Sequence, residues 1–111
     1  MESAVEALGS VELNLELRHA ASKGETEKVK SLLKAGAKIH ANYDAALRDA
    51  AYWGHTETVK VLLEEKADPY TLNASPLRLA EKNKHQETAK VLMDAMDSGR
   101  TPQPWPSERE V

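Results

Sequence analysis

Residues 47–63 read LRDAAYWGHTETVKVLL, and the positions of this stretch recur at a fixed step of 30 residues along the chain. The recurring residues are mostly apolar or basic: Leu17, Leu47 and Leu77; Ala20, Ala50 and Ala80; Leu32, Leu62 and Leu92; Lys30, Lys60 and Lys90. A fixed period of this size is typical of a stacked repeat array, in which each unit buries its apolar face only against its neighbours. We therefore expect a solenoid.

Each period predicts two helices joined by a tight turn. In the first helix, small and apolar residues share one side (Leu47, Ala50, Ala51, Gly54), and larger polar and aromatic residues share the other (Arg48, Asp49, Tyr52, Trp53). Gly54 ends this helix, and a second helix places Val59, Leu62 and Leu63 on its buried side. The units are therefore antiparallel helix pairs, and the predicted fold class is all-α.

The stretch from Leu47 to Leu63 resembles the ankyrin repeat, whose pattern reads roughly TPLHLAAxxGHxEIVKLLLxxGAD. SPLRLA at residues 75–80 is similar to the start of this pattern, and AGAKIHA at residues 35–41 is similar to its end. The resemblance covers about residues 14–96. It implies an ankyrin-repeat solenoid of three stacked helix-turn-helix units, a non-enzymatic fold that usually binds other proteins.

Two departures from the family pattern affect the turns. The usual ankyrin period is 33 residues, so the turns between units are shortened here, and we expect the projecting β-hairpin to be shortened or absent. The join from Ile39 to Ala51 is similar to a 30-residue variant abundant in large DNA viruses and some bacteria. Lys66 stands where unit one has Gly36. A lysine in the left-handed backbone region costs about 1 kcal/mol, so we expect a loose or distorted turn there.

The chain divides into three parts. Residues 1–13 form an N-terminal segment with a candidate capping helix from Ser3 to Leu8. Residues 14–96 form the repeat domain, with units at about 14–43, 44–73 and 74–96, and Asn14 and Asp44 are predicted helix N-caps. Residues 97–111 form a flexible, proline-rich C-terminal tail. Trp105 in this tail is either part of a short linear motif, a residue that folds back over Met93 and Met96, or part of a disordered segment.

Composition restricts the class of partner. The net charge is −3, and residues 15–96 hold 13 basic and 12 acidic side chains, which is not the basic footprint of a nucleic-acid-binding domain. No apolar run approaches the ~20 residues that span a bilayer, the start does not resemble a signal peptide, and there is no Cys. We expect no nucleic acid, no membrane and a cytoplasmic location.

Neither a metal site nor a catalytic site is predicted. The four histidines are not spaced as zinc ligands, and His55 and His85 occupy the place of the turn histidine of ankyrin repeats. There is no nucleophile elbow, phosphate loop or HExxH motif. The chain is therefore expected to be no enzyme and to need no cofactor.

The outward side of the first helices is the predicted partner-binding site, on the concave face of the array. Trp, Tyr and Arg are enriched at binding hot spots, and the candidate residues are Arg48, Asp49, Tyr52, Trp53, Tyr43, Arg18, Lys23, Tyr70 and Lys82. An acidic or amphipathic segment would suit this surface. Two alternatives stay open, namely that Tyr52 and Trp53 pack on the neighbouring unit, and that Tyr43 and Tyr70 only pack at the shortened turns.

Two functions follow from this surface. The first is a protein–protein interaction module that acts by occlusion or scaffolding, including as a small inhibitor of viral or bacterial type. The second is a structural protein that self-associates into a homo-oligomer, with the ends of the array or the aromatic patch as the interface. The recurring arginines (Arg18, Arg48, Arg78) are expected to be structural, through bonds to the carbonyls of the next turn or to Asp44 and Asp49.

Overall fold

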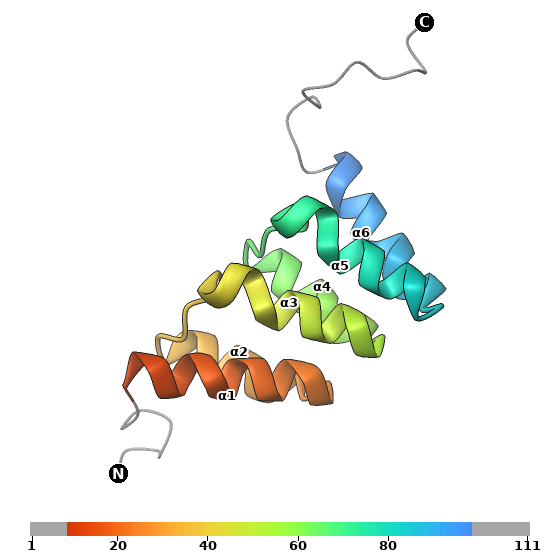
Figure 1. Ribbon diagram of the computed structural model, residues 1–111. Helices are drawn as coiled ribbons and strands as arrows, with labels where there is room; N and C mark the ends of the chain where they lie inside the picture. The colour runs from red at the N-terminus through yellow and green to blue at the C-terminus, as the bar shows by residue number, and fades with distance from the viewer. Residues whose placement is uncertain (1–8, 99–111) are drawn as a thin grey trace, which may run out of the picture.

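The computed structural model describes residues 9–98, and this range folds into six helices without a strand (Figure 1). The helices are α1 (Ser10–Lys23), α2 (Thr26–Lys34), α3 (Ala41–Trp53), α4 (Thr56–Glu64), α5 (Thr71–Lys82) and α6 (Gln86–Ser98). They form three successive pairs that stack in chain order, which confirms the predicted all-α array of three units. Helix α1 begins before residue 14 and α6 ends after residue 96. The candidate capping helix at Ser3–Leu8 and Trp105 lie outside the described residues.

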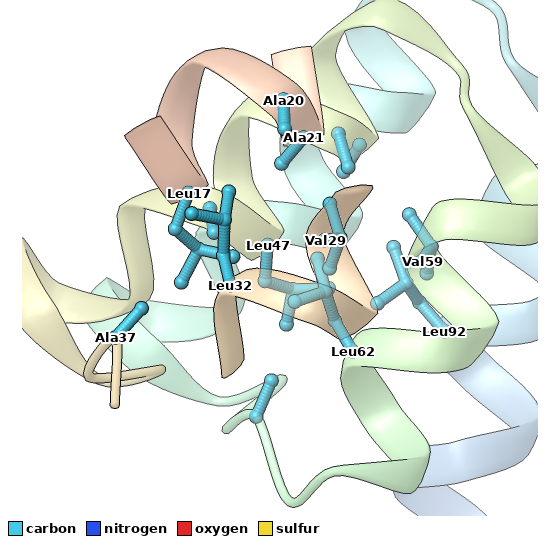
Figure 2. Close-up of a cluster of buried hydrophobic side chains, with 14 of the residues drawn as sticks. Leu17, Ala20, Ala21, Val29, Leu32, Ala37, Leu47, Val59, Leu62 and Leu92 are labelled. Atoms are coloured by element: carbon cyan, nitrogen blue, oxygen red, sulfur yellow. The ribbon is translucent and has the colours of Figure 1, made fainter. Parts of the chain in front are cut away.

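The core runs continuously through the stack because equivalent positions of each unit supply it. In Figure 2, Leu17 and Leu47 of the first helices meet Leu32 and Leu62 of the second helices, and each is at most 2% exposed. Burying one such leucine stabilises the fold by about 1.5–3 kcal/mol. Between the first helices lie small residues with at most 1% exposure (Ala20, Ala50, Ala80), so α1, α3 and α5 pack closely side by side.

The turns inside units one and two favour glycine for two reasons, whereas unit three has Lys84 at the same position with a φ of 64°. Gly54 has a φ of 74°, and its N–H donates to the Ala51 carbonyl. A Cβ at Gly54 would lie 2.5 Å from Nδ1 of His85, because that ring packs on the turn from the following unit. His85 Nε2 donates to the Tyr52 carbonyl at 3.0 Å, and His55 makes the equivalent bond to Ser22 at 2.9 Å. The turn histidines thus tie each unit to the one before.

The joins between units contain no β-hairpin within the described chain. They contain three consecutive residues in the left-handed region instead, at Asn42–Asp44 and Leu72–Ala74, with φ between 50° and 60°. Arg48 donates from Nε to the Tyr43 carbonyl at 3.1 Å and from Nη2 to the Asn42 carbonyl at 2.7 Å. Arg78 holds the equivalent carbonyls of the next join, both at 3.0 Å. The two arginines therefore bond turn carbonyls, but those of the join before them and not, as was expected, those of the next turn.

Asn14 and Asp44 do not cap helices, so that prediction is wrong. Asn14 lies inside α1, and its Oδ1 accepts a hydrogen bond from the Lys38 N–H at 2.7 Å. The carboxylate of Asp44 is buried and accepts from the Asp68 N–H at 2.9 Å. An N-cap residue has extended backbone, whereas Asp44 is left-handed. Both side chains therefore fasten the start of a unit to the backbone that follows its second helix.

The turn at Lys66 is not distorted, contrary to expectation. Lys66 is left-handed, with a φ of 79°. The Lys66 N–H donates to Leu63 at 3.0 Å and the Ala67 N–H donates to Leu62 at 2.9 Å. The Gly36 turn has the same two bonds, at 3.1 and 3.0 Å. The surrounding hydrogen bonds therefore hold lysine in the conformation that glycine adopts in unit one.

Candidate functional site

Four equivalent positions in each first helix or just after it are exposed or partly exposed, and together these form one surface that we call the inner-helix face. Its members are Arg18, His19, Ser22 and Lys23 of α1, Arg48, Asp49, Tyr52 and Trp53 of α3, Arg78, Leu79 and Lys82 of α5, and Asn83, which follows α5. The three helices lie side by side, so α3 supplies the middle of the surface (Figure 1).

An aromatic pair stands at the end of the middle helix of the inner-helix face. Tyr52 is 41% exposed and Trp53 is 57% exposed, and they are two of the large apolar side chains left open to solvent. Their ring centroids lie 4.9 Å apart with an interplanar angle of 73°, which is an edge-to-face contact. The contact holds both rings in place at the end of α3 while leaving much of their surface open.

On the α1 side, an ion pair joins the first two units. Nε of Arg18 lies 2.7 Å from Oδ2 of Asp49, so these two predicted site residues are brought together across α1 and α3. Lys23 is exposed at the last position of α1, the register position of Trp53. The Arg18 side chain is 45% exposed, so solvent screens this pair and its contribution to stability is small.

On the α5 side, polar residues reach the end of α3. Nδ2 of Asn83 donates to the Tyr52 carbonyl at 3.3 Å, the same oxygen that accepts from His85. Lys82 is exposed at the last position of α5, the register position of Tyr52. Cationic side chains therefore lie on both sides of the Tyr52–Trp53 pair.

Tyr43 lies at the other end of α3, away from the aromatic pair. It is 69% exposed and belongs to the left-handed join that Arg48 holds. A shallow, open depression begins there, lined by His40, Asn42, Tyr43, Asp44, Asp68 and Thr71. Oδ2 of Asp44 lies 3.0 Å from Nδ1 of His40 and also accepts the Asp68 N–H, so the floor of this depression is already hydrogen-bonded.

Tyr70 is placed differently from the other predicted site residues. It is half-buried, and its hydroxyl donates to the Met96 carbonyl of α6 at 2.8 Å. This bond joins the residue before α5 to α6, the second helix of unit three. The structure therefore directs the polar end of Tyr70 towards α6.

Two exposed apolar residues outside the predicted site stand on α1. Val11 is 70% exposed and Leu15 is 48% exposed. The residues equivalent to Leu15 are Ala45 and Ser75, which are 2% and 8% exposed. The sequence could have indicated this exposed position, because Leu15 is larger than the equivalent residues of the other two units.

The described residues show neither a metal site nor a membrane span. Between residues 9 and 98, no three His, Cys, Asp or Glu side chains converge as metal ligands. Within the same range, no helix has both the length and the apolar character needed to cross a bilayer. Every buried polar side-chain atom in this part of the chain has a hydrogen-bond partner.

Three helix pairs stacked at a 30-residue period define an all-α repeat solenoid. The sequence family described as Ankyrin repeats (3 copies) matches residues 17–102, and the chain belongs to this family. Ankyrin repeats are in general protein–protein interaction modules and typically lack enzymatic activity. No curated protein is similar enough to the chain to match it.

Proposed function

We propose that the chain is a non-enzymatic module that binds a partner protein through the inner-helix face, centred on Tyr52 and Trp53. The observation that carries this proposal is the exposed edge-to-face pair in the middle unit. Aromatic residues supply large contact areas with few side-chain rotations to fix, which is why they dominate binding hot spots. Arg18 and Asp49 form an ion pair on the same face and would add polar contacts.

The module would act by occlusion or by scaffolding. A repeat surface acts on a partner protein by covering part of its surface or by holding it beside another protein. Covering a functional surface of the partner would make the chain an inhibitor, and holding two proteins at once would make it a scaffold.

Affinity capture from a lysate of the native source tests the proposal. The bait is the full chain, beside a Tyr52→Ala/Trp53→Ala variant and a control variant, Lys90→Ala/Met93→Ala, which shortens two exposed side chains of α6. Circular dichroism checks that all three are folded. A partner retained by wild type and control but lost by the aromatic variant supports the inner-helix face. A partner retained equally by all three would place the site elsewhere.

Self-association is a second candidate, which exposed Val11 and Leu15 specifically favour. In units two and three, the positions equivalent to Leu15 are buried. On α1 the same position is open, so the first unit has an apolar end on which a second copy could stack. Such an end-to-end contact would produce a homo-oligomer.

Light scattering at tens of micromolar protein tests this candidate. Wild type is compared with Val11→Ser/Leu15→Ser, which removes the apolar end, and with the aromatic variant. Stacking through α1 is supported if wild type and the aromatic variant are dimers and the serine variant is a monomer. A wild-type monomer contradicts self-association.

A further inference from the structure

We infer that the partner presents an acidic segment in extended conformation to the inner-helix face. Its carboxylates would lie near Lys23 and Lys82, and an apolar side chain between them would pack on Tyr52 and Trp53. This inference rests on the proposed function and adds the chemistry of the partner.

The first argument is the segregation of charge. Five of the twelve side chains of the inner-helix face are cationic (Arg18, Lys23, Arg48, Arg78, Lys82), and Asp49 is the single anionic one. The whole chain has the opposite balance, with 15 Lys and Arg against 18 Asp and Glu. A cationic face on an acidic chain favours anionic partners, because complementary potentials speed association and reject wrong partners.

The second argument concerns which cations are available. Arg18 is paired with Asp49, and Arg48 and Arg78 are bonded to backbone carbonyls, which fixes their guanidinium groups without neutralising them. Lys23 and Lys82 are exposed, and neither forms an ion pair with any residue in the range 9–98. These two lysines can therefore take a carboxylate without giving up an internal partner.

The third argument is spacing. Lys23 and Lys82 end the helices on either side of α3, so the aromatic pair lies between them. Neighbouring helices pack ~8–10 Å apart, which puts the two lysine backbones ~16–20 Å apart across α3. An extended chain advances ~3.3 Å per residue and covers this span in about five or six residues. The segment that fits has acidic residues at both ends and an apolar residue in the middle.

A nucleic acid is the competing anionic partner, because bases can stack on aromatic rings. The charge balance of the chain favours the acidic protein segment, because the sequence pI of about 5.8 is far from the basic domain that phosphate binding needs.

Fluorescence anisotropy with defined probes tests the inference on the full chain. The probe is a labelled nine-residue peptide with two glutamates at each end, glycine spacers and a central Pro-Leu-Pro. The comparison probes are the same peptide with lysines in place of the glutamates, a rearranged peptide with all four glutamates together, and a twelve-residue oligothymidine. Each is measured at low and at physiological salt.

The decisive variant is Lys23→Gln/Lys82→Gln, matched by Lys34→Gln/Lys90→Gln, which removes the same charge from α2 and α6. Exposed ion pairs each change affinity by a few-fold. We therefore expect the first variant to weaken binding of the acidic peptide by about tenfold, and the control to weaken it by less than about twofold. We also expect the rearranged peptide to bind more weakly, and binding to weaken as salt rises.

Three binding patterns would overturn the inference, as would a fourth result, the absence of acidic-peptide binding. The three patterns are equal binding of the lysine peptide, equal effects of the two lysine variants, and tighter binding of oligothymidine, which would assign a nucleic-acid partner. If the acidic peptide does not bind, the capture experiment with Tyr52→Ala/Trp53→Ala still decides the proposed function, because it makes no assumption about charge.

Discussion

Lys66 keeps a side chain in a backbone conformation that suits glycine, at a φ of 79°. Since the turn has the hydrogen bonds of the Gly36 turn, we predict that Lys66→Gly relieves strain without changing the structure. The left-handed region costs a non-glycine residue about 1–2 kcal/mol, and the flexibility of glycine in the unfolded chain offsets about half of this. The free energy of unfolding should rise by about 0.5–1 kcal/mol in urea denaturation.

A glycine placed elsewhere in the same unit controls for this prediction. Lys60 is an exposed residue in the interior of α4. Lys60→Gly should lower the free energy of unfolding by about 1 kcal/mol, because glycine is a poor helix former. If Lys66→Gly also lowered the stability, the interpretation of the turn as strained would be wrong.

At Gly54, in contrast to Lys66, glycine is the stabilising residue, because any side chain there would meet the His85 ring. We predict that Gly54→Ala lowers the free energy of unfolding by at least about 1–2 kcal/mol, from the positive φ alone, and by more from the clash. The double variant Gly54→Ala/His85→Ala removes the clashing ring. Its cost should be smaller than the sum of the two single costs by about 0.5–3 kcal/mol. Additive costs would show that the ring does not pack on the turn.

At the scale of elements, the left-handed joins depend on an arginine that belongs to the following helix. We predict that Arg48→Met, which keeps the apolar stem, destabilises the fold by about 1 kcal/mol, because both carbonyl bonds are lost. Amide exchange at residues 42–44 should speed up more than elsewhere.

Arg18→Met is the matched control for the joins. It breaks only an exposed ion pair and should cost about 0.5 kcal/mol or less. It should also leave exchange at residues 42–44 unchanged. A similar effect of both variants on that exchange would mean that Arg48 does not hold the join.

The helices and their buried faces could be predicted, because periodicity records which side of an element meets the core. Leu47, Ala50 and Leu62 are all fully buried, as their spacing indicated. The partners of polar side chains could not be predicted in the same way. Asp44 reaches the backbone of Asp68, a contact that exists only once the join has folded. Its sequence context alone suggests a cap.

In the candidate site too, some features could be predicted from the sequence and others could not. The side of α3 that carries Tyr52 and Trp53 follows from helical geometry, so their exposure could be predicted. The edge-to-face contact of the two rings and the bond from Tyr70 to Met96 depend on side-chain rotamers and on the distance to another helix. Neither contact can be predicted from the spacing of residues.

At the scale of the whole molecule, the continuous core predicts cooperative unfolding. Leu62 is fully buried in the middle unit, and Leu62→Ala should lower the free energy of unfolding by about 2–5 kcal/mol. Three units are close to the minimum for a stable array, so the outer units should not survive loss of the middle one. Circular dichroism and Trp53 fluorescence, in a Trp105→Phe background, should report one shared transition. Separate transitions would show that the units fold independently.

The turn histidines and two threonine contacts would allow a second copy of the middle unit to stack on the first. Thr26 contacts Thr58 at 2.8 Å and Thr56 contacts Thr88 at 2.7 Å, so unit two offers one threonine to each neighbour. His55 receives its backbone partner from the unit before, and Tyr52 supplies the carbonyl for the unit after. A tandem copy of residues 44–73 inserted after residue 73 would therefore find every one of these partners in place. The array can grow by gene-level duplication of its centre, and each added copy would bring another Tyr–Trp pair to the same surface.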